Sequence, residues 1–474
     1  MTAATIALFW ALAAWALVGR DGRRLVCGFF ASLPFMSFAV VPVDFLGGLS
    51  LTPAPVLGTL LVLRTALAGR GARVMLTDAL LPRRMLLLTL FWAVAVVITL
   101  FMPAILAGRV LVIPVRAAWM GPVPLIPSAQ NLSQLGYLTV SVLLALAFAV
   151  ILREPEGRRR AFGALCLGGW VAVATGLMDY ASLRLPLEAV LAPFRTASYA
   201  LLVSDQALGG KRVVGLMPEA SSFGLLCLGF LSLLCFLRRG LDGERRAGLP
   251  VLLGLLAVCV WLSTSSAAYV GLALLGIVLA VDWVWRAAGL RRGAPGRHGL
   301  AAEAWVAGGA LAAVMLVLVV FPAGPERLVA GFDAMVLQKP SSSSYLERSQ
   351  WTATSWRALL ASWGLGVGVG STRASSSIVA VAAGTGLLGA ALYLAFVAQT
   401  LARRARPGDA EGALLLGGLR WALLPPFAVD LMIGSGADFG PFLAFLFGLG
   451  VAACAPEPAA EPEDVPDEAE PAAG

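Results

Sequence analysis

Long apolar stretches separated by short polar connections run along almost the whole chain. Residues 85–108 and 132–152 are continuously apolar, and a helix needs roughly 20 such residues to cross a bilayer core about 30 Å thick. A transmembrane β-barrel would instead alternate apolar and polar residues in strands of about 10 residues. Because lipid offers the backbone no hydrogen-bond partner, the pattern predicts an all-α, polytopic transmembrane helical bundle.

The prediction comprises about 12–13 spans. The apolar stretches cover residues 2–18, 25–43, 45–63, 85–107, 132–152, 161–178, 215–237, 249–262, 266–285, 303–321, 376–402, 413–433 and 438–454. The stretch at 249–262 is short. The number of spans formed by the two stretches on either side of 263–265 could be counted differently, and so could the number formed by the last two stretches. We expect residues 1–455 to form one multi-span domain.

The Lys and Arg residues indicate how this domain is oriented. If the connection after the first span is cytoplasmic, alternation places 23 of the 35 basic residues on that side, eleven on the other and one within a span. Cytoplasmic loops carry such an excess, so we predict a multi-pass membrane protein with an extracytoplasmic N-terminus and a cytoplasmic C-terminus. Basic residues follow the first span, the reverse of a signal peptide, so this span is expected to be permanent.

The composition excludes several classes of protein. The chain is 59% hydrophobic and 13% charged, whereas a soluble domain carries about 25% charged residues. Seven acids among Pro and Ala at 456–474 predict a disordered cytoplasmic tail. Without these acids the net charge rises from +8 to +15, an excess that suits loops facing anionic lipid and gives no argument for nucleic acid. The six cysteines lack a CxxC spacing, so no metal site is predicted.

Three connections on the predicted outer side are long, at about residues 108–131, 179–214 and 322–375. Loops beyond about 12–15 residues are uncommon without a function, so we expect the chemistry outside or in the outer half of the membrane. The GxGxxG spacing at 384–389 lies inside an apolar stretch, which favours helix–helix contact over nucleotide binding. The only histidine, His298, falls in a predicted cytoplasmic connection.

The first polar stretch that lipid burial does not explain covers residues 211–224. Lys211 and Arg212 precede Glu219 and Ser221 where a span begins. Ionisable groups at such a depth usually face the bundle interior and mark a functional path. Gly and Pro residues delay the helix here and leave N–H groups that can meet an anion. The alternative is ordinary helix capping by Glu219 and Ser221, with Arg212 among the lipid headgroups.

The second polar stretch, at 345–363, predicts an amphipathic helix along the outer interface, with tryptophans at headgroup depth. Arg348 and Arg357 are nine residues apart, which is about half a turn out of phase on a straight helix. They therefore cannot face one ligand unless the helix breaks, and we favour Arg348 as the residue that faces the site. The alternative is that both arginines extend to the headgroups.

These two stretches resemble a known family. RVVGLMPEASSFG at 212–224 is similar to a motif of O-antigen and exopolysaccharide polymerases and of the related O-antigen ligases. RSQWTATSWRALLASWGLGVGVGS at 348–371, followed by GTGLLGAALYLAF at 384–396, resembles their long extracytoplasmic loop and its next helix. Ala220 stands where the family usually has proline, and Arg373 has no counterpart that we can assign.

The resemblance implies a membrane glycosyltransferase of the bacterial inner membrane with a GT-C-like helical bundle. Such enzymes take a glycan from an undecaprenyl-diphosphate-linked donor and pass it to a hydroxyl of another lipid-linked glycan, without metal or other cofactor. Membrane lipid, a flippase and a chain-length regulator are the implied partners. Ligases, of lipid A core or of protein, use a histidine in the large outer loop, and the predicted outer loops contain none, so a polymerase is favoured.

The resemblance and the chemistry together suggest roles for individual residues. Fixed guanidinium groups stabilise the charge that develops on a diphosphate leaving group, and a carboxylate can take the proton of the acceptor hydroxyl. Glu219, Arg212 and Arg348 are the catalytic candidates, with Asp205 and Glu347 as alternative bases. The candidates for substrate binding are Arg357, Ser221, Lys211, Trp351 and Asp205. A transporter or flippase, and a structural partner of an assembly complex, are the alternatives from other classes.

Overall fold

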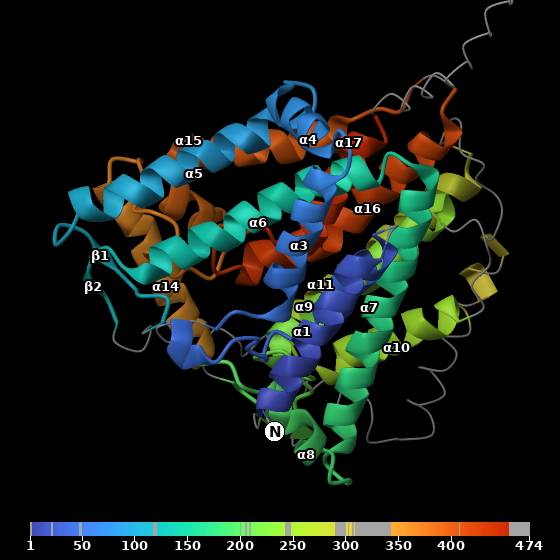
Figure 1. Ribbon diagram of the computed structural model, residues 1–474, viewed down its shortest axis with the longest axis horizontal. Helices are drawn as coiled ribbons and strands as arrows, with labels where there is room; N and C mark the ends of the chain where they lie inside the picture. The colour runs from blue at the N-terminus through green and yellow to red at the C-terminus, as the bar shows by residue number, and fades with distance from the viewer. Residues whose placement is uncertain are drawn as a thin grey trace, which may run out of the picture.

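The computed structural model describes residues 2–19, 22–46, 50–116, 121–199, 201–203, 206–207, 210–241, 248–289, 300–301, 303–305, 308, 343–406 and 408–454. These residues form a helical bundle with two small two-stranded sheets (Figure 1). Seven of the described helices are long and apolar enough to cross a membrane. The chain is therefore a multi-span helical membrane protein by the length and composition of its helices.

The long apolar helices are α5 (Leu86–Ile105), α6 (Ala129–Ile151), α7 (Pro155–Ala181), α9 (Ala220–Leu241), α11 (Ser266–Ala287), α15 (Ser377–Ala402) and α16 (Ala410–Ile433). Four shorter apolar helices are α1 (Thr2–Val18), α3 (Pro53–Leu67), α10 (Leu249–Leu262) and α17 (Gly440–Ala452). The remaining helices are α2 (Arg23–Ser32), α4 (Gly71–Leu80), α8 (Glu188–Leu191), α14 (Ser343–Ala361) and the 3-10 turns η1 (Val43–Leu46) and η3 (Ala192–Phe194).

The two small sheets lie in the connections. Strands β1 (Leu111–Val112) and β2 (Val123–Pro124) pair antiparallel, as do β3 (Gln206–Ala207) and β4 (Gly210–Lys211). Both hairpins belong to connections that the sequence predicts on the outer side. Residues 322–342 of the third long connection, most of the expected span at 303–321 and the tail at 456–474 lie outside the described residues.

One predicted span is wrong in its second half. The apolar stretch at 25–43 forms a helix only to Ser32, and residues 33–42 are irregular. The backbone N–H of Ser37 donates to the carbonyl of Leu216 at 2.9 Å, and its carbonyl accepts from the backbone of Thr196 and Ala197. Irregular backbone is tolerated at membrane depth where it is buried in protein, and other segments of this chain supply the partners here.

Helix α15 is broken at Gly386, whose φ is 74° and ψ is 174°. At the break the N–H of Leu387 donates to the carbonyl of Gly364, and the carbonyl of Ala383 accepts from Val367. The glycine-rich run at 364–370 therefore inserts against the break and pairs both the donor and the acceptor of the helical bond that Leu387 and Ala383 would otherwise form with each other. The sequence predicts a close-backbone turn here, and Gly364, Gly366, Gly368 and Gly370 all have a positive φ.

Aromatic packing holds the centre of the bundle. Phe30 of α2, Phe148 of α6 and Phe445 of α17 are fully buried, with ring centroids 5.3–5.9 Å apart. Lipid tails are as apolar as these rings, so close packing rather than release from water favours their contact. This cluster ties the N-terminal helices to the last helix of the chain.

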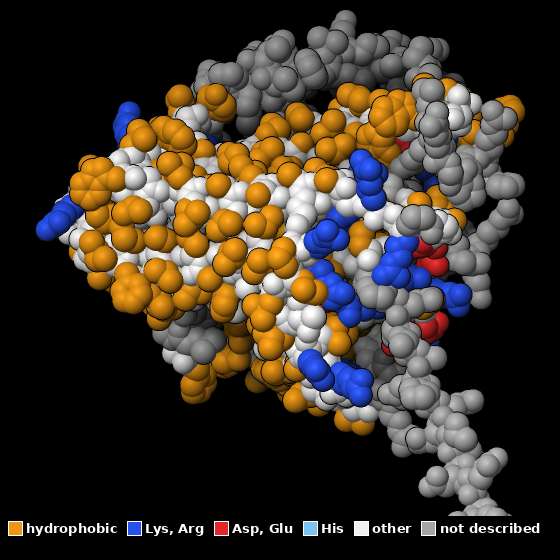
Figure 2. All heavy atoms as spheres, turned by 90° about the horizontal axis from the view of Figure 1, so that it is seen from above, with side chains coloured by type: hydrophobic (Ala, Val, Ile, Leu, Met, Phe, Trp, Pro, Cys, Tyr) orange, Lys and Arg blue, Asp and Glu red, His pale blue; other side chains and the backbone are white. Residues whose placement is uncertain are grey.

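Three connections that the sequence places on one side of the membrane meet at one end of the bundle. The fully buried carboxylate of Asp78 accepts from Arg84, before α5, and from Arg153, after α6. Arg403, after α15, donates to the carbonyls of Arg83 and Arg84. Figure 2 shows basic side chains gathered toward one end of a face that is mostly apolar. The shared end of these three connections is thereby confirmed.

Candidate functional site

The opposite end of the bundle contains the two polar stretches that the sequence singles out. Arg84 precedes α5, Arg153 follows α6 and Arg403 follows α15, and these arginines meet at one end of the bundle. The other ends of the three helices therefore lie at the opposite end. Asn131, near the start of α6, donates to the carbonyl of Val369 at 2.9 Å and to the hydroxyl of Ser371 at 2.8 Å. These bonds hold the segment that leads into α15.

Arg373, two residues further on, is fixed by its backbone. Its N–H donates to the carbonyl of Ile113 at 2.9 Å, and its carbonyl accepts from the hydroxyl of Ser355 at 2.9 Å. Ser355 lies on α14 and its hydroxyl is also 2.9 Å from that of Thr372. Contacts from other segments of the chain thus fix the backbone position from which the Arg373 side chain extends.

The guanidinium of Arg373 lies 4.0 Å from the centre of the Trp351 ring, in a cation–π contact. Burial lowers the pKa of Arg373, Glu219 and Glu347 raise it, and Arg348 lowers it. These three charged residues therefore lie within electrostatic reach of one guanidinium. The Nε of Arg373 is buried and has no hydrogen-bond partner within the described part of the chain.

Glu219 is half-buried directly before α9, and the hydroxyl of Ser221 donates to its carboxylate. The carbonyl of Glu219 accepts from the N–H of Phe223 at 3.1 Å, so the residue closes the first turn of the helix. Helix capping and a site role are therefore compatible at this position, because the carboxylate is also within electrostatic reach of Arg373.

Arg348 and Arg357 differ as the helical spacing predicts. Helix α14 is continuous, and Arg348 is half-buried on it while Arg357 is exposed. The tryptophans divide in the same way, since Trp351 is 8% exposed and Trp356 is 47% exposed. One face of α14 thus brings Arg348 and Trp351 to Arg373, and Arg357 is not part of this group.

Arg212 and Lys211 lie against other partners. The Nε of Arg212 donates to the hydroxyl of Thr264 at 3.1 Å, in the turn between α10 and α11. The Nζ of Lys211 lies 2.8 Å from the carboxylate of Asp179. The structure therefore gathers Glu219 and Arg348 around Arg373 and holds Arg212 and Lys211 by separate contacts. Asp205 lies outside the described residues.

Asp179, at the end of α7, organises the segment before Glu219. Its fully buried carboxylate accepts from the backbone N–H of Val214 at 2.8 Å and of Gly215 at 3.1 Å. It also accepts from Arg195 at 2.8 Å. The sequence analysis missed this residue because it lies directly after the apolar stretch at 161–178, although an acid at such a position can mark a functional site. Arg373 was missed for a different reason, because no spacing relates it to Glu219.

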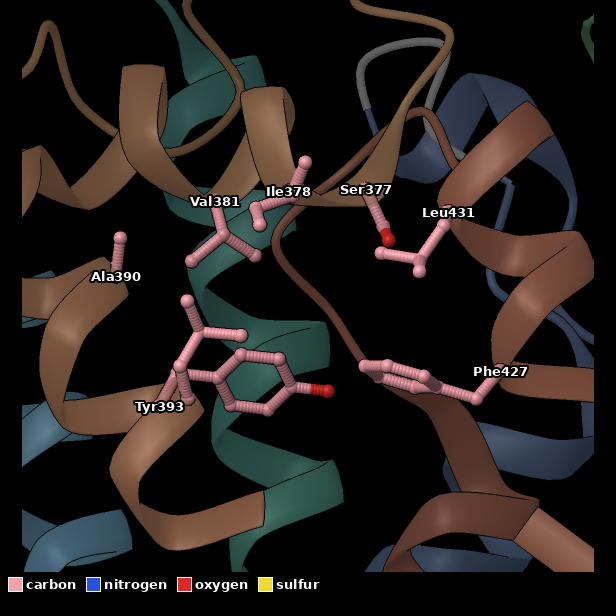
Figure 3. A pocket seen from close by; sticks show the side chains of 8 residues that line it. Ser377, Ile378, Val381, Ala390, Tyr393, Phe427 and Leu431 are labelled. Atoms are coloured by element: carbon pink, nitrogen blue, oxygen red, sulfur yellow. The ribbon is translucent and has the colours of Figure 1, made fainter. Parts of the chain in front are cut away.

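A small hollow with a cavity volume of about 10 Å³ lies between α15 and α16, and its lining begins four residues after Arg373 (Figure 3). Its lining is apolar except for two hydroxyl groups, and comprises Ser377, Ile378, Val381, Ala390, Tyr393, Leu394, Phe427 and Leu431. The hydroxyl of Tyr393 points into it. Ile378 and Leu394 of α15 are 42% and 39% exposed, so the hollow opens to the apolar surface of this helix.

Among the residues described, no group of three or more His, Cys, Asp or Glu side chains is placed to hold a metal ion. Comparisons with protein-family models, with curated protein sequences and with solved structures found no match to this chain.

Proposed function

We propose that this protein is a membrane glycosyltransferase that polymerises glycan repeat units carried on a lipid diphosphate. The observation that supports this most directly is Arg373: a rigidly held guanidinium, half-buried at one end of a membrane bundle, with one N–H lacking a partner among the described residues. An arginine placed in this way is suited to an anion such as a phosphate, which it can bind through two parallel hydrogen bonds.

The proposed reaction assigns distinct roles to the grouped residues. An acceptor hydroxyl attacks the anomeric carbon of the donor, and the bond from that carbon to the diphosphate oxygen breaks. Its electron pair remains on the diphosphate, where Arg373 and Arg348 stabilise the charge that develops. The hydroxyl proton passes to Glu219, the carboxylate that directly precedes α9 and lies within electrostatic reach of Arg373.

The apolar hollow supports a lipid-linked donor rather than a soluble nucleotide sugar. Ser377, on its rim, follows Arg373 by four residues, and its lining reaches the apolar surface of α15. A phosphate held by Arg373 would therefore stand near the exposed apolar side chain of Ile378, against which the lipid chain would lie. Undecaprenyl diphosphate, in the bacterial inner membrane, is the carrier that this proposal names.

The test uses single variants of the full-length protein in a host strain that lacks the native gene. Arg373→Ala, Arg348→Ala and Glu219→Gln are expected to lower polymer output at least tenfold, because each removes a charge used in the transition state. Arg357→Ala is the matched control, since this arginine is exposed on the same helix as Arg348. Electrophoresis of surface polysaccharide and immunoblotting of membranes give product and abundance.

The products distinguish the candidate functions. A polymerase leaves single-repeat material when it is inactive, whereas a ligase leaves long lipid-linked chains without their final anchor. An inactive transporter would leave repeat units on the cytoplasmic side of the membrane, where a glycosidase added from outside does not reach them. Full polymer output from Arg373→Ala at normal abundance would refute the proposed site.

A further inference from the structure

Helix α6 carries a polar stripe that the roles above do not use. Gln130, Gln134, Tyr137 and Ser141 are separated by four, three and four residues, so they lie on one face of the helix. Helix α6 is one of the candidate membrane spans, and polar side chains in a span face the protein interior and mark functional positions. The stripe begins next to Asn131, which holds the Arg373 segment.

Gln134 lies between two turns that carry charged residues. A Cβ added at Gly370 would be 3.0 Å from the Cβ of Gln134, and a Cβ added at Gly436 would be 3.7 Å from its Oε1. Gly370 precedes Arg373 by three residues, and Gly436 precedes Asp438 by two. The stripe therefore runs from the segment of Arg373 to the turn of Asp438.

Asp438 continues this polar surface at the turn between α16 and α17. Its carboxylate accepts from the hydroxyl of Ser141 and from the N–H of Gly440, which lies 3.1 Å away. Tyr137 is within electrostatic reach of Asp438 and donates to the carbonyl of Ser50 at 3.2 Å. Gln134, Tyr137 and Asp438 are each half-buried, so they are partly accessible.

The chemistry of this surface differs from that of Arg373. It offers an amide, a phenol, a hydroxyl and a carboxylate, which together donate and accept hydrogen bonds. The carboxylate would repel a phosphate but can accept from the hydroxyl groups of a neutral sugar. The Oε1 of Gln130, at the Arg373 end, is buried and has no hydrogen-bond partner among the residues described.

From this juxtaposition we infer that Gln134, Tyr137, Ser141 and Asp438 form a sugar-binding subsite that holds the acceptor glycan beside the phosphate-binding Arg373. The inference rests on the proposed function and assigns its second substrate to a specific surface. The acceptor ring lies on the stripe, and its reactive hydroxyl is presented toward Glu219. Gln134, Tyr137 and Asp438 contact the acceptor, whereas the buried Ser141 acts through its hydrogen bond to Asp438, and none of the four exchanges a proton in the reaction.

The experiment measures acceptor dependence with purified full-length protein in liposomes. The donor is lipid-diphosphate-linked oligomer from the host, and the acceptor probe is the repeat-unit glycan on a short uncharged alkyl chain, which cannot act as a donor. Asp438→Asn and Gln134→Ala are expected to raise the KM for the acceptor probe about tenfold, with kcat and the KM for the donor within about twofold. Ser141→Ala should act in the same direction.

Ser133→Ala is the matched control, because this hydroxyl lies on the same helix and donates to the carbonyl of Gln130. An unchanged acceptor KM in Asp438→Asn and Gln134→Ala, with activity still lost in Arg373→Ala, would overturn the subsite and leave the proposed function standing. A rise in the donor KM instead would assign the stripe to the donor glycan and also overturn it. Absence of transfer by the unsubstituted protein would refute the proposed function itself.

Discussion

At the scale of the residue, a single buried carboxylate fixes the segment that leads to Glu219. Asp179 receives two backbone N–H bonds from Val214 and Gly215, and Arg195 adds a bond to the carbonyl of Gly215 at 3.0 Å. A buried charge is tolerated only where it is paired and hydrogen-bonded, and Arg195 and Lys211 supply the opposite charges here. Lys211, which the sequence suggested for substrate binding, has a structural partner in this arrangement.

Asp179→Asn is expected to lower the free energy of unfolding by about 3–5 kcal/mol, because it leaves two cationic groups without their buried counter-charge. Glu188→Gln is the control: Glu188 pairs with the same Arg195 but is 57% exposed, and an exposed pair contributes about 0–1 kcal/mol. Thermal unfolding of the purified proteins in detergent compares the two. Equal effects of the two substitutions would show that burial of Asp179 is not what makes its pairs important.

At the scale of the element, the break in α15 and the glycine-rich run depend on each other. A Cβ on Gly366 would lie 2.5 Å from the N of Gly386, and a Cβ on Gly386 would lie 2.4 Å from the carbonyl O of Leu365. Contacts this short leave room only for glycine on both sides. The inserted run is also anchored to α5, because the N–H of Val369 donates to the hydroxyl of Thr99 at 3.0 Å. Arg373 follows directly, so the break contributes to the geometry of the site.

Gly386→Ala is expected to destabilise the protein by about 1–3 kcal/mol from its backbone conformation alone, since φ 74° and ψ 174° suit only glycine. The steric contact with Leu365 adds to this cost and should displace Arg373, so polymer output should fall as well. Gly276→Ala, inside α11 with open space around the added Cβ, should stabilise its helix by up to about 1 kcal/mol. Unfolding in detergent and polysaccharide electrophoresis provide both measurements, and an unaffected Gly386 variant would refute the role of the break.

At the scale of the whole molecule, the hydrophobic pattern determined the spans but not the site. Apolar length located the long helices, and it also predicted the short helix at 249–262, because lipid burial leaves a local signal in the sequence. The failure at 25–43 has the opposite cause: the partners of the irregular residues after Ser32 come from distant segments. Arg373 and Glu219 are likewise brought together by packing over more than 150 residues of chain, which no local spacing reveals.

The grouping of connections at two ends of the bundle also predicts how the protein is exposed across the membrane. Arg70 and Arg159 lie in connections of the arginine-rich end, and Arg357 lies on α14 at the other; all three side chains are exposed. Because arginine-rich connections remain cytoplasmic, an impermeant maleimide should label Arg357→Cys in intact spheroplasts. It should label Arg70→Cys and Arg159→Cys only after permeabilisation.

The unsubstituted protein gives the background of this labelling, since its six cysteines are buried or half-buried. The reverse pattern would place Arg373 and Glu219 in the cytoplasm, and would contradict a donor used on the extracytoplasmic side. Labelling of Arg70→Cys and Arg159→Cys from different sides would contradict the bundle itself, because Asp78 joins their two connections directly through Arg84 and Arg153. The same three variants therefore test both the arrangement of the helices and the compartment in which the proposed reaction takes place.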